Sequence, residues 1–293
     1  MLHLYGYDYA IKNVYLTASG TVGERPVDSF DQLRNYYLDA LERLAPDLPI
    51  NRSKSKFVTE PVIEEQLAGF FSASVLDDLK QDQVIGPAYP AAARQSKQER
   101  VALAWKTLAG RSVEFARILD LLVHSVFIRS AAGIGTRTPR AGTTSGAPGV
   151  IWLAVHDHES TEDLVEILIH ELTHLLMFAD ELVHPQFDYA QITRRENFSA
   201  SAILRDARPL DKVVHSMVVG TEIVLGRSAL RPLSHAGTGA HVDSRRIAAG
   251  VTSAYRELAG RCSAGRGMTS HTREIIDLCD RQCRAYSPEQ AAP

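Results

Sequence analysis

This sequence has few cysteines, no long apolar run and only a small net charge. Only three cysteines occur among 293 residues, at Cys262, Cys279 and Cys283, and an odd number near one end does not make a disulfide framework. No apolar run is long enough to cross a bilayer, and the first residues lack the basic and apolar regions of a signal peptide. A formal net charge of −3 gives no reason to expect a nucleic-acid partner. We therefore expect a cytoplasmic protein that binds neither membranes nor nucleic acids.

The most specific signal in the chain is an H-E-x-x-H pattern made by His170, Glu171 and His174. It lies in a stretch with helical periodicity over residues 161–182. Residues four apart share one face of a helix, so both imidazoles can reach one cation while Glu171 stands beside them. The same helix has a wide apolar surface, which predicts burial, and buried polar side chains need partners. The pattern therefore predicts a metal site.

Periodicity and capping signals predict a mainly α (α+β) fold of about seven helices, with a small sheet strand next to the metal helix. The first twenty residues, which mix tyrosines with β-branched residues, predict an irregular or short-strand start. Two short β segments are expected at 124–129 and 150–155, and a loop at 86–93. The expected helices cover residues 29–44, 61–79, 96–122, 161–182, 210–226, 241–259 and 271–284.

A long connection rich in Gly, Thr, Ser and Pro joins the two expected β segments. A structureless connection of this length inside a compact domain is usually functional. Because the second β segment leads within a few residues into the metal helix, the connection should lie near the metal site. We interpret it as a loop that covers or grips a substrate.

Two histidines do not hold a catalytic metal alone, and three downstream residues are candidates for the third ligand. Asp180 stands where metzincin peptidases carry a histidine, but Met177 replaces the glycine of that pattern. Glu196 follows His174 by 22 residues, a spacing that suits peptidases with a glutamate ligand. His215 lies in the apolar helical segment 210–226. The pattern alone leaves all three open.

A second motif joins the first. HELTH is followed by R-x-x-x-R-P-L-x-x-x-x-H, here Arg205, Arg208, Pro209, Leu210 and His215. The two motifs in this order resemble the HExxH-motif family found in gene clusters for ribosomally synthesised peptide natural products (RiPPs). The resemblance covers about residues 120–226.

The resemblance implies an Fe(II)- and 2-oxoglutarate-dependent dioxygenase that uses O₂ to hydroxylate a side-chain carbon, often the β-carbon, of a residue in a precursor peptide. It implies His170, His174 and His215 as iron ligands, which would leave positions for the keto acid and O₂. Arg208, or else Arg205, would bind the distal carboxylate of 2-oxoglutarate. We expect one catalytic domain over residues 1–293, with a motif region at 120–226 and helical parts at 1–95 and 230–293 packed on it.

Two other interpretations stay open. In a zinc endopeptidase, Asp180 or Glu196 would complete a Zn²⁺ site and Glu171 would be the catalytic general base that activates water. In the oxygenase, Glu171 would instead orient a ligand or a water molecule. A binding module stabilised by a metal would need a fourth ligand close to the metal helix, for which the candidates are His156, His158 and His184.

Overall fold

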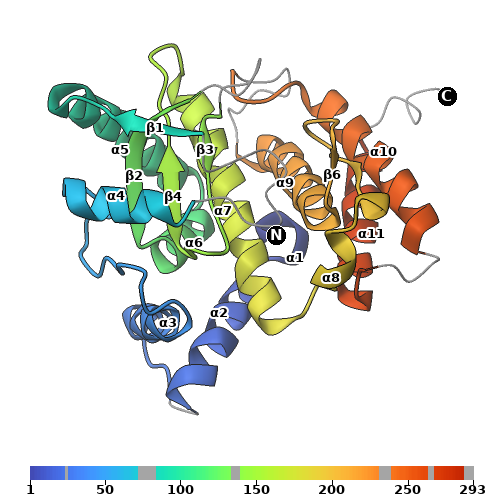
Figure 1. The fold of residues 1–293 in the computed structure, drawn as a ribbon, viewed down its shortest axis with the longest axis horizontal. Helices are drawn as coiled ribbons and strands as arrows, with labels where there is room; N and C mark the ends of the chain where they lie inside the picture. Colours follow the sequence, from blue (N-terminus) through green and yellow to red (C-terminus); the bar gives the residue numbers. More distant parts are fainter. Residues whose placement is uncertain (24–25, 72–83, 133–138, 231–238, 263–266, 287–293) are drawn as a thin grey trace. The chain divides into compact units, whose positions relative to one another are not determined.

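The computed structural model describes residues 1–23, 26–71, 84–132, 139–230, 239–262 and 267–286 (Figure 1). Over these residues the protein is mainly helical with a small mixed sheet, so the expected fold class is confirmed. The chain forms two compact units. One contains residues 7–183, and the other combines residues 1–6 with residues 184–293.

The unit of residues 7–183 holds the larger sheet, in the strand order β1-β2-β4-β3. Strands β2 and β4 are parallel, and β1 and β3 flank them in antiparallel orientation. The strands are β1 (Ile85–Ala88), β2 (Ser125–Ala131), β3 (Ala141–Gly142) and β4 (Val150–Leu153). The helices are α2 (Tyr7–Val22), α3 (Phe30–Leu44), α4 (Pro61–Gly69), α5 (Ala91–Arg111), α6 (Val113–Leu122) and α7 (Thr161–Val183).

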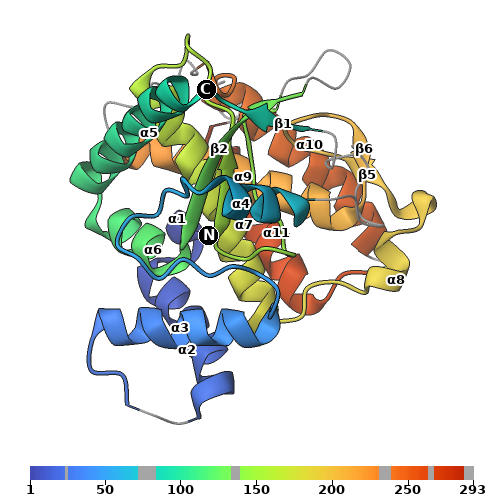
Figure 2. The ribbon, with the colours of Figure 1, turned by 60° about the vertical axis from the view of Figure 1, so that its left-hand side comes forward.

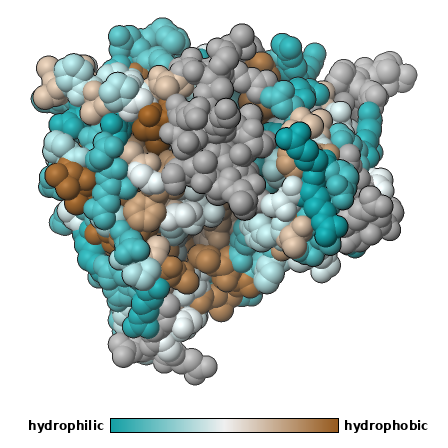
Figure 3. All heavy atoms as spheres, in the orientation of Figure 1, coloured by the Kyte–Doolittle hydropathy of each residue, from teal (hydrophilic) through white to brown (hydrophobic). Residues whose placement is uncertain are grey.

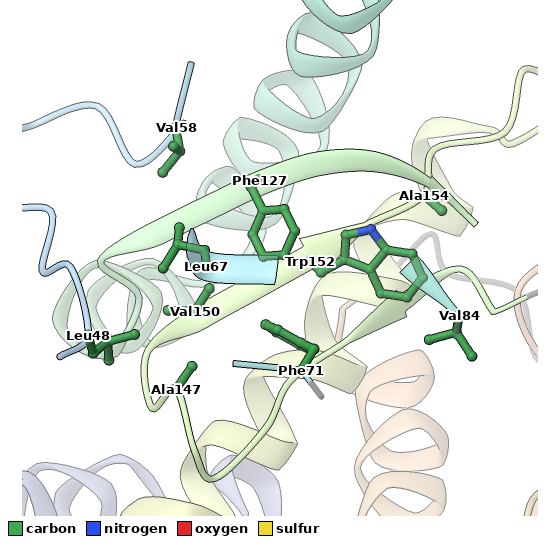
Figure 4. Close-up of a cluster of buried hydrophobic side chains, with 10 residues drawn as sticks. All are labelled: Leu48, Val58, Leu67, Phe71, Val84, Phe127, Ala147, Val150, Trp152 and Ala154. Carbon is green, nitrogen blue, oxygen red and sulfur yellow. The ribbon is translucent and has the colours of Figure 1, made fainter. Parts of the chain in front are cut away.

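The two faces of this sheet are buried by different elements. Phe127 and Trp152 are direct neighbours on β2 and β4, and Leu67 of α4 packs with them in one apolar cluster together with Phe71 (Figure 4). Successive strand residues point to opposite faces. The intervening residues of β2 and β4 are also fully buried, and α5 packs against β2 and α7 (Figure 2). Near-continuous burial on both faces is typical of a parallel strand pair.

The second unit contains α1 (Leu2–Tyr5) and the C-terminal helices. Glu222 of α9, 1% exposed, accepts hydrogen bonds from the backbone N–H groups of His3 and Leu4 and pairs with the ammonium group of Met1. These contacts attach the first residues to α9. The other elements are α8 (Tyr189–Ile192), the 3-10 helix η2 (Arg195–Asn197), the strand pair β5 (Ser199–Ala200) and β6 (Ala207–Arg208), α9 (Leu210–Ala229), α10 (Ser244–Cys262) and α11 (Ser270–Arg284).

Several sequence-based expectations need correction. The first twenty residues are helical, as α1 and α2, and do not form strands. The expected loop at 86–93 contains β1 and the start of α5. The expected helix 96–122 is two helices, because Ser112 adopts an extended conformation and its hydroxyl accepts a hydrogen bond from Phe115 N, which begins α6. Part of the expected helix 61–79 lies outside the described residues; α4 ends at Gly69.

The face of the molecule drawn in Figure 3 carries both hydrophobic and hydrophilic side chains. Figure 3 shows small groups of hydrophobic atoms separated by hydrophilic ones. In the part of the chain that the structure describes, no helix combines the length and apolar character required to cross a membrane. On α11, Cys279 and Cys283 are buried free thiols, and the Thr221 hydroxyl lies 3.4 Å from the Cys283 sulfur.

His124 makes the stability of the unit 7–183 dependent on pH. This fully buried imidazole lies before β2, with Nε2 3.1 Å from the carbonyl of Pro148 and Nδ1 2.9 Å from the Ser125 hydroxyl. Burial, and secondarily the charges of Arg34 and Lys56, lower its pKa to about 4. The unfolded chain binds this proton near pH 6.5, so stability should fall as pH drops from about 6.5 towards 4, by up to about 3 kcal/mol. Urea unfolding across this range should show a shallower loss in His124→Gln, and equal slopes would contradict the assignment.

Candidate metal centre

Polar contacts fix the beginning of α7, the helix that carries H-E-x-x-H. The Ser160 hydroxyl accepts a hydrogen bond from Asp163 N, and the Asp163 carboxylate accepts bonds from the backbone N–H and the hydroxyl of Ser160. This is a reciprocal capping arrangement. Arg111 at the end of α5 donates two bonds of 2.6 Å to the Glu162 carboxylate. Because both ends of this planar pair are charged, it orients the first turn of α7 on α5.

The Nε2 atoms of His170 and His174 point towards the same place. Their Nε2 atoms lie 3.2 Å apart, and their rings are centred 5.0 Å apart. A cation at about 2.0–2.1 Å from both nitrogens would subtend an angle of about 100° between them, which lies between the octahedral and tetrahedral values. The distance also suits a hydrogen bond between neutral imidazoles. The pair therefore fits a shared cation without rearrangement, as the spacing of four residues predicts.

Glu171 stands beside this pair in a different environment. Its Oε1 lies 3.9 Å from His170 Nε2, and its side chain is 5% exposed, compared with 23% for His170. Burial raises the pKa of Glu171 to about 8, and the Thr143 hydroxyl acts in the opposite direction. Among the described residues, neither Oε2 of Glu171 nor Oγ1 of Thr143 completes a hydrogen bond of good geometry, although both are buried. Two neighbouring buried oxygens that lack a well-formed hydrogen bond are suited to a bound ligand or water.

Thr143 is a site residue that the motif search misses. It follows β3, inside the Gly, Ser and Thr-rich connection between β2 and β4. β3 pairs with β4 and contacts α7, so the described end of this connection, residues 139–148, does lie beside the metal helix. The short step from the second β segment into the metal helix predicted this position, but not which hydroxyl of the connection faces Glu171. Residues 133–138 of the connection lie outside the described residues.

Asp180 does not face the histidine pair. Six residues after His174, its side chain is rotated by about 120° around the helix. It is fully buried, and its Oδ1 accepts hydrogen bonds of 2.6 Å from the Tyr9 hydroxyl and 2.8 Å from Asn13 Nδ2, both on α2. These bonds join α2 to α7. Asp180 is therefore a packing contact and a poor candidate for the third ligand.

His215, Arg208 and Arg205 belong to the other unit, where they differ in environment. His215 lies in the second turn of α9 and is 6% exposed. Burial, and then the charges of Lys212 and Arg208, lower the pKa of His215 to about 3, so its imidazole is neutral at pH 7. Arg208, on β6, is 8% exposed. Arg205 is exposed, with φ +64°, and a Cβ at Gly250 would lie 3.2 Å from its guanidinium.

The candidates of the two alternative interpretations lie apart from the histidine pair or in the other unit. Glu196 is exposed on η2, in the other unit. His156 and His158 stack 5.6 Å apart before α7 begins, and His170 lies about 14 Å further along the helix axis. The His184 ring is centred 4.8 Å from that of His271, in the other unit. Within the described part of each unit, no three His, Cys, Asp or Glu side chains are grouped as metal ligands.

The structure thus brings His170, Glu171 and His174 together in one unit, and describes His215, Arg205 and Arg208 in the other. Comparison with protein-family models and with curated proteins found no match to this chain.

Proposed function

We propose that this chain is an Fe(II)- and 2-oxoglutarate-dependent oxygenase that hydroxylates a side-chain carbon, in our interpretation the β-carbon, of a residue in a ribosomally synthesised precursor peptide. The observation that carries the proposal is the 3.2 Å separation of the His170 and His174 Nε2 atoms, with a buried carboxyl beside them. The choice of an oxygenase comes from the resemblance of the two motifs to the HExxH-motif family of RiPP biosynthesis.

Three features of the site support this choice over a peptidase. Asp180 is held by Tyr9 and Asn13, and Glu196 is exposed, so neither third ligand of the peptidase interpretation is favoured. His215 is neutral and buried, as an imidazole ligand must be to offer its lone pair. Arg208 is buried and acts electrostatically on His215, whereas Arg205 is exposed. We therefore assign Arg208 as the cation for the distal carboxylate of 2-oxoglutarate.

In this proposal His170, His174 and His215 hold iron through ring nitrogens, and the bound iron supplies the oxidation in which O₂ and 2-oxoglutarate yield CO₂, succinate and a hydroxylated carbon. The side chains of the protein bind the iron and the 2-oxoglutarate carboxylate, and they orient a water or ligand beside the metal. The imidazoles must be neutral to bind iron, and the guanidinium of Arg208 pairs with a carboxylate in a planar fork. Glu171 and Thr143 present buried oxygens beside His170 and orient a water or ligand there.

The test is anaerobic reconstitution with Fe(II), followed by 2-oxoglutarate, O₂ and the precursor peptide encoded beside the gene. We expect succinate and a product heavier by one oxygen atom, in equal amounts. Absence of both with the correct peptide would overturn the proposal. Arg208→Gln should raise the KM for 2-oxoglutarate by about tenfold or more, because the carboxylate loses a charged partner. Arg205→Gln is the matched control and should change that KM little.

A zinc endopeptidase is the second candidate, because the buried Glu171 carboxyl lies 3.9 Å from His170, beside the place that a cation shared by the histidine pair would take. The Glu171→Gln variant separates the two functions. In a peptidase it should abolish cleavage by the zinc-loaded protein. In the oxygenase it should leave partial hydroxylation, because that reaction needs no base at this position.

A further inference from the structure

The larger sheet ends in β3, which has a partner on one side only among the described residues. Ala141 and Gly142 pair with Leu153 and Trp152 of β4, and the strand order places β3 at the edge. All residues from 139 to 144 are partly exposed. An edge strand presents a row of backbone donors and acceptors, which is a template for another extended chain.

The register shows which backbone groups face outward. Ala154 N donates a 2.7 Å hydrogen bond to Arg140 O, so these two residues form a hydrogen-bonded pair of the antiparallel ladder. Such pairs alternate with pairs whose N–H and C=O groups point away from each other. The backbone groups of Ala141 therefore point away from β4, and the same alternation, continued one residue beyond the end of β3, would turn those of Thr143 outward as well. Within the described chain, no backbone group bonds to the N–H of Ala141 on that side.

The two edges of the same sheet differ in a way that matters for pairing. The opposite edge, β1, contains Pro87, which has no N–H to offer an added strand. Proline on an edge is a common way to prevent pairing with another chain. β3 contains no proline and is followed by two threonines. Among the described residues, the segment from Arg140 to Thr144 keeps its backbone donors, and Pro139 marks the limit of this edge on the N-terminal side.

This edge is continuous with the candidate metal centre. Thr143 directly follows β3, and its hydroxyl acts on the carboxyl of Glu171, next to His170. Neighbouring strands lie about 4.8 Å apart. A chain paired with Ala141 and Thr143 would therefore run past the same end of the site that holds the buried oxygens of Thr143 and Glu171.

We propose that the outer edge of β3 binds the peptide substrate as an added, extended strand, with its backbone paired to Ala141 and Thr143. The identification of the occupant as substrate rests on the proposed function. Backbone hydrogen bonds give such a site affinity for many sequences, and alternate side chains give selectivity. Successive side chains of the substrate would point to opposite faces of the sheet, so only every second residue could present its carbon to the metal centre.

The test uses peptides selected from a display library of short random linear sequences on the metal-free wild-type protein, without 2-oxoglutarate. Affinity is then measured by fluorescence polarisation. Ala141→Pro removes the outward N–H and fixes φ at this position, while the bond from Ala154 N to Arg140 O involves neither changed group, and it should weaken binding about tenfold. Ala141→Ser keeps the N–H and should bind as the wild type does. Thermal unfolding of both variants checks the fold.

A second measurement needs no protein variant. N-methylation of the peptide, one residue at a time, should weaken binding only at alternate residues, because alternate backbone N–H groups face β3. A library without binders, or binding that resists Ala141→Pro and lacks this alternation, would overturn the proposal. Alternating binding without hydroxylation would retain the peptide site and reject the oxygenase. Hydroxylation of the peptide without this alternation would retain the oxygenase and reject the peptide site on β3.

Discussion

His170→Ala should abolish metal binding while leaving the fold intact. The variant removes the His170 Nε2 atom, which lies 3.2 Å from His174 Nε2. The His170 side chain is partly exposed, so its loss removes little packing. We expect the affinity for Co(II), used as a spectroscopic substitute for iron, to fall at least about 100-fold, because losing a direct ligand should cost more than losing an outer hydrogen bond. The measurement is the visible absorption of the Co(II)-loaded protein during titration, with thermal unfolding recorded in parallel.

His158→Ala is the matched control for this experiment. His158 is an exposed histidine in the loop before α7, and its ring stacks on His156 rather than on the metal pair. It should bind Co(II) as the wild type does. His215→Ala tests the third ligand separately and should weaken the binding and change the spectrum. If His170→Ala and His174→Ala both retained wild-type affinity, the histidine pair would be a hydrogen-bonded contact and not a metal site.

Gly149→Ala should strongly destabilise the unit of residues 7–183. Gly149 has φ +85°, where an L side chain is strained, and a Cβ there would lie 2.6 Å from His124 Cδ2 and 2.7 Å from the Leu122 carbonyl oxygen. Neither neighbour can move easily, because His124 is fully buried and Leu122 ends α6. We expect the free energy of unfolding to fall by about 2–4 kcal/mol.

Gly110→Ala is the control, since Gly110 lies within α5 and a Cβ would meet nothing within 4 Å. It should stabilise the protein by up to about 1 kcal/mol, because alanine favours the helix more than glycine does. Urea unfolding of both variants measures the difference. A Gly149→Ala variant as stable as the wild type would mean that the turn before β4 can relax.

The elements with strong local signals were predictable from sequence. α7 begins at Thr161 and ends at Val183, almost as expected, because capping residues and an apolar surface agree there. α3 begins after Ser29, where the expected helix 29–44 starts, and the Ser29 hydroxyl accepts a hydrogen bond from Gln32 N, which caps the helix. The geometry of His170 and His174 follows directly from their spacing on this helix.

Elements that depend on distant contacts were missed. The buried side of α2 is made of Ala10, Val14 and Ala18, which are mostly small and give little apolar signal. Asn13 on the same helix is buried because Asp180 accepts its hydrogen bond. β3 has two residues and exists only through its pairing with β4. The contact of Thr143 with Glu171 is likewise invisible to a local pattern, since it joins a loop to a helix.

The attachment of residues 1–6 to α9 has a consequence for synthesis on the ribosome. Glu222, which accepts hydrogen bonds from His3 N and Leu4 N, is made more than two hundred residues after them. The unit of residues 7–183 is complete in the nascent chain before α9 emerges, and domains generally fold as units in the order of synthesis. The first six residues therefore cannot contact Glu222 while the unit that carries His170 and His174 folds, and they reach their place on α9 only when the last third of the chain arrives.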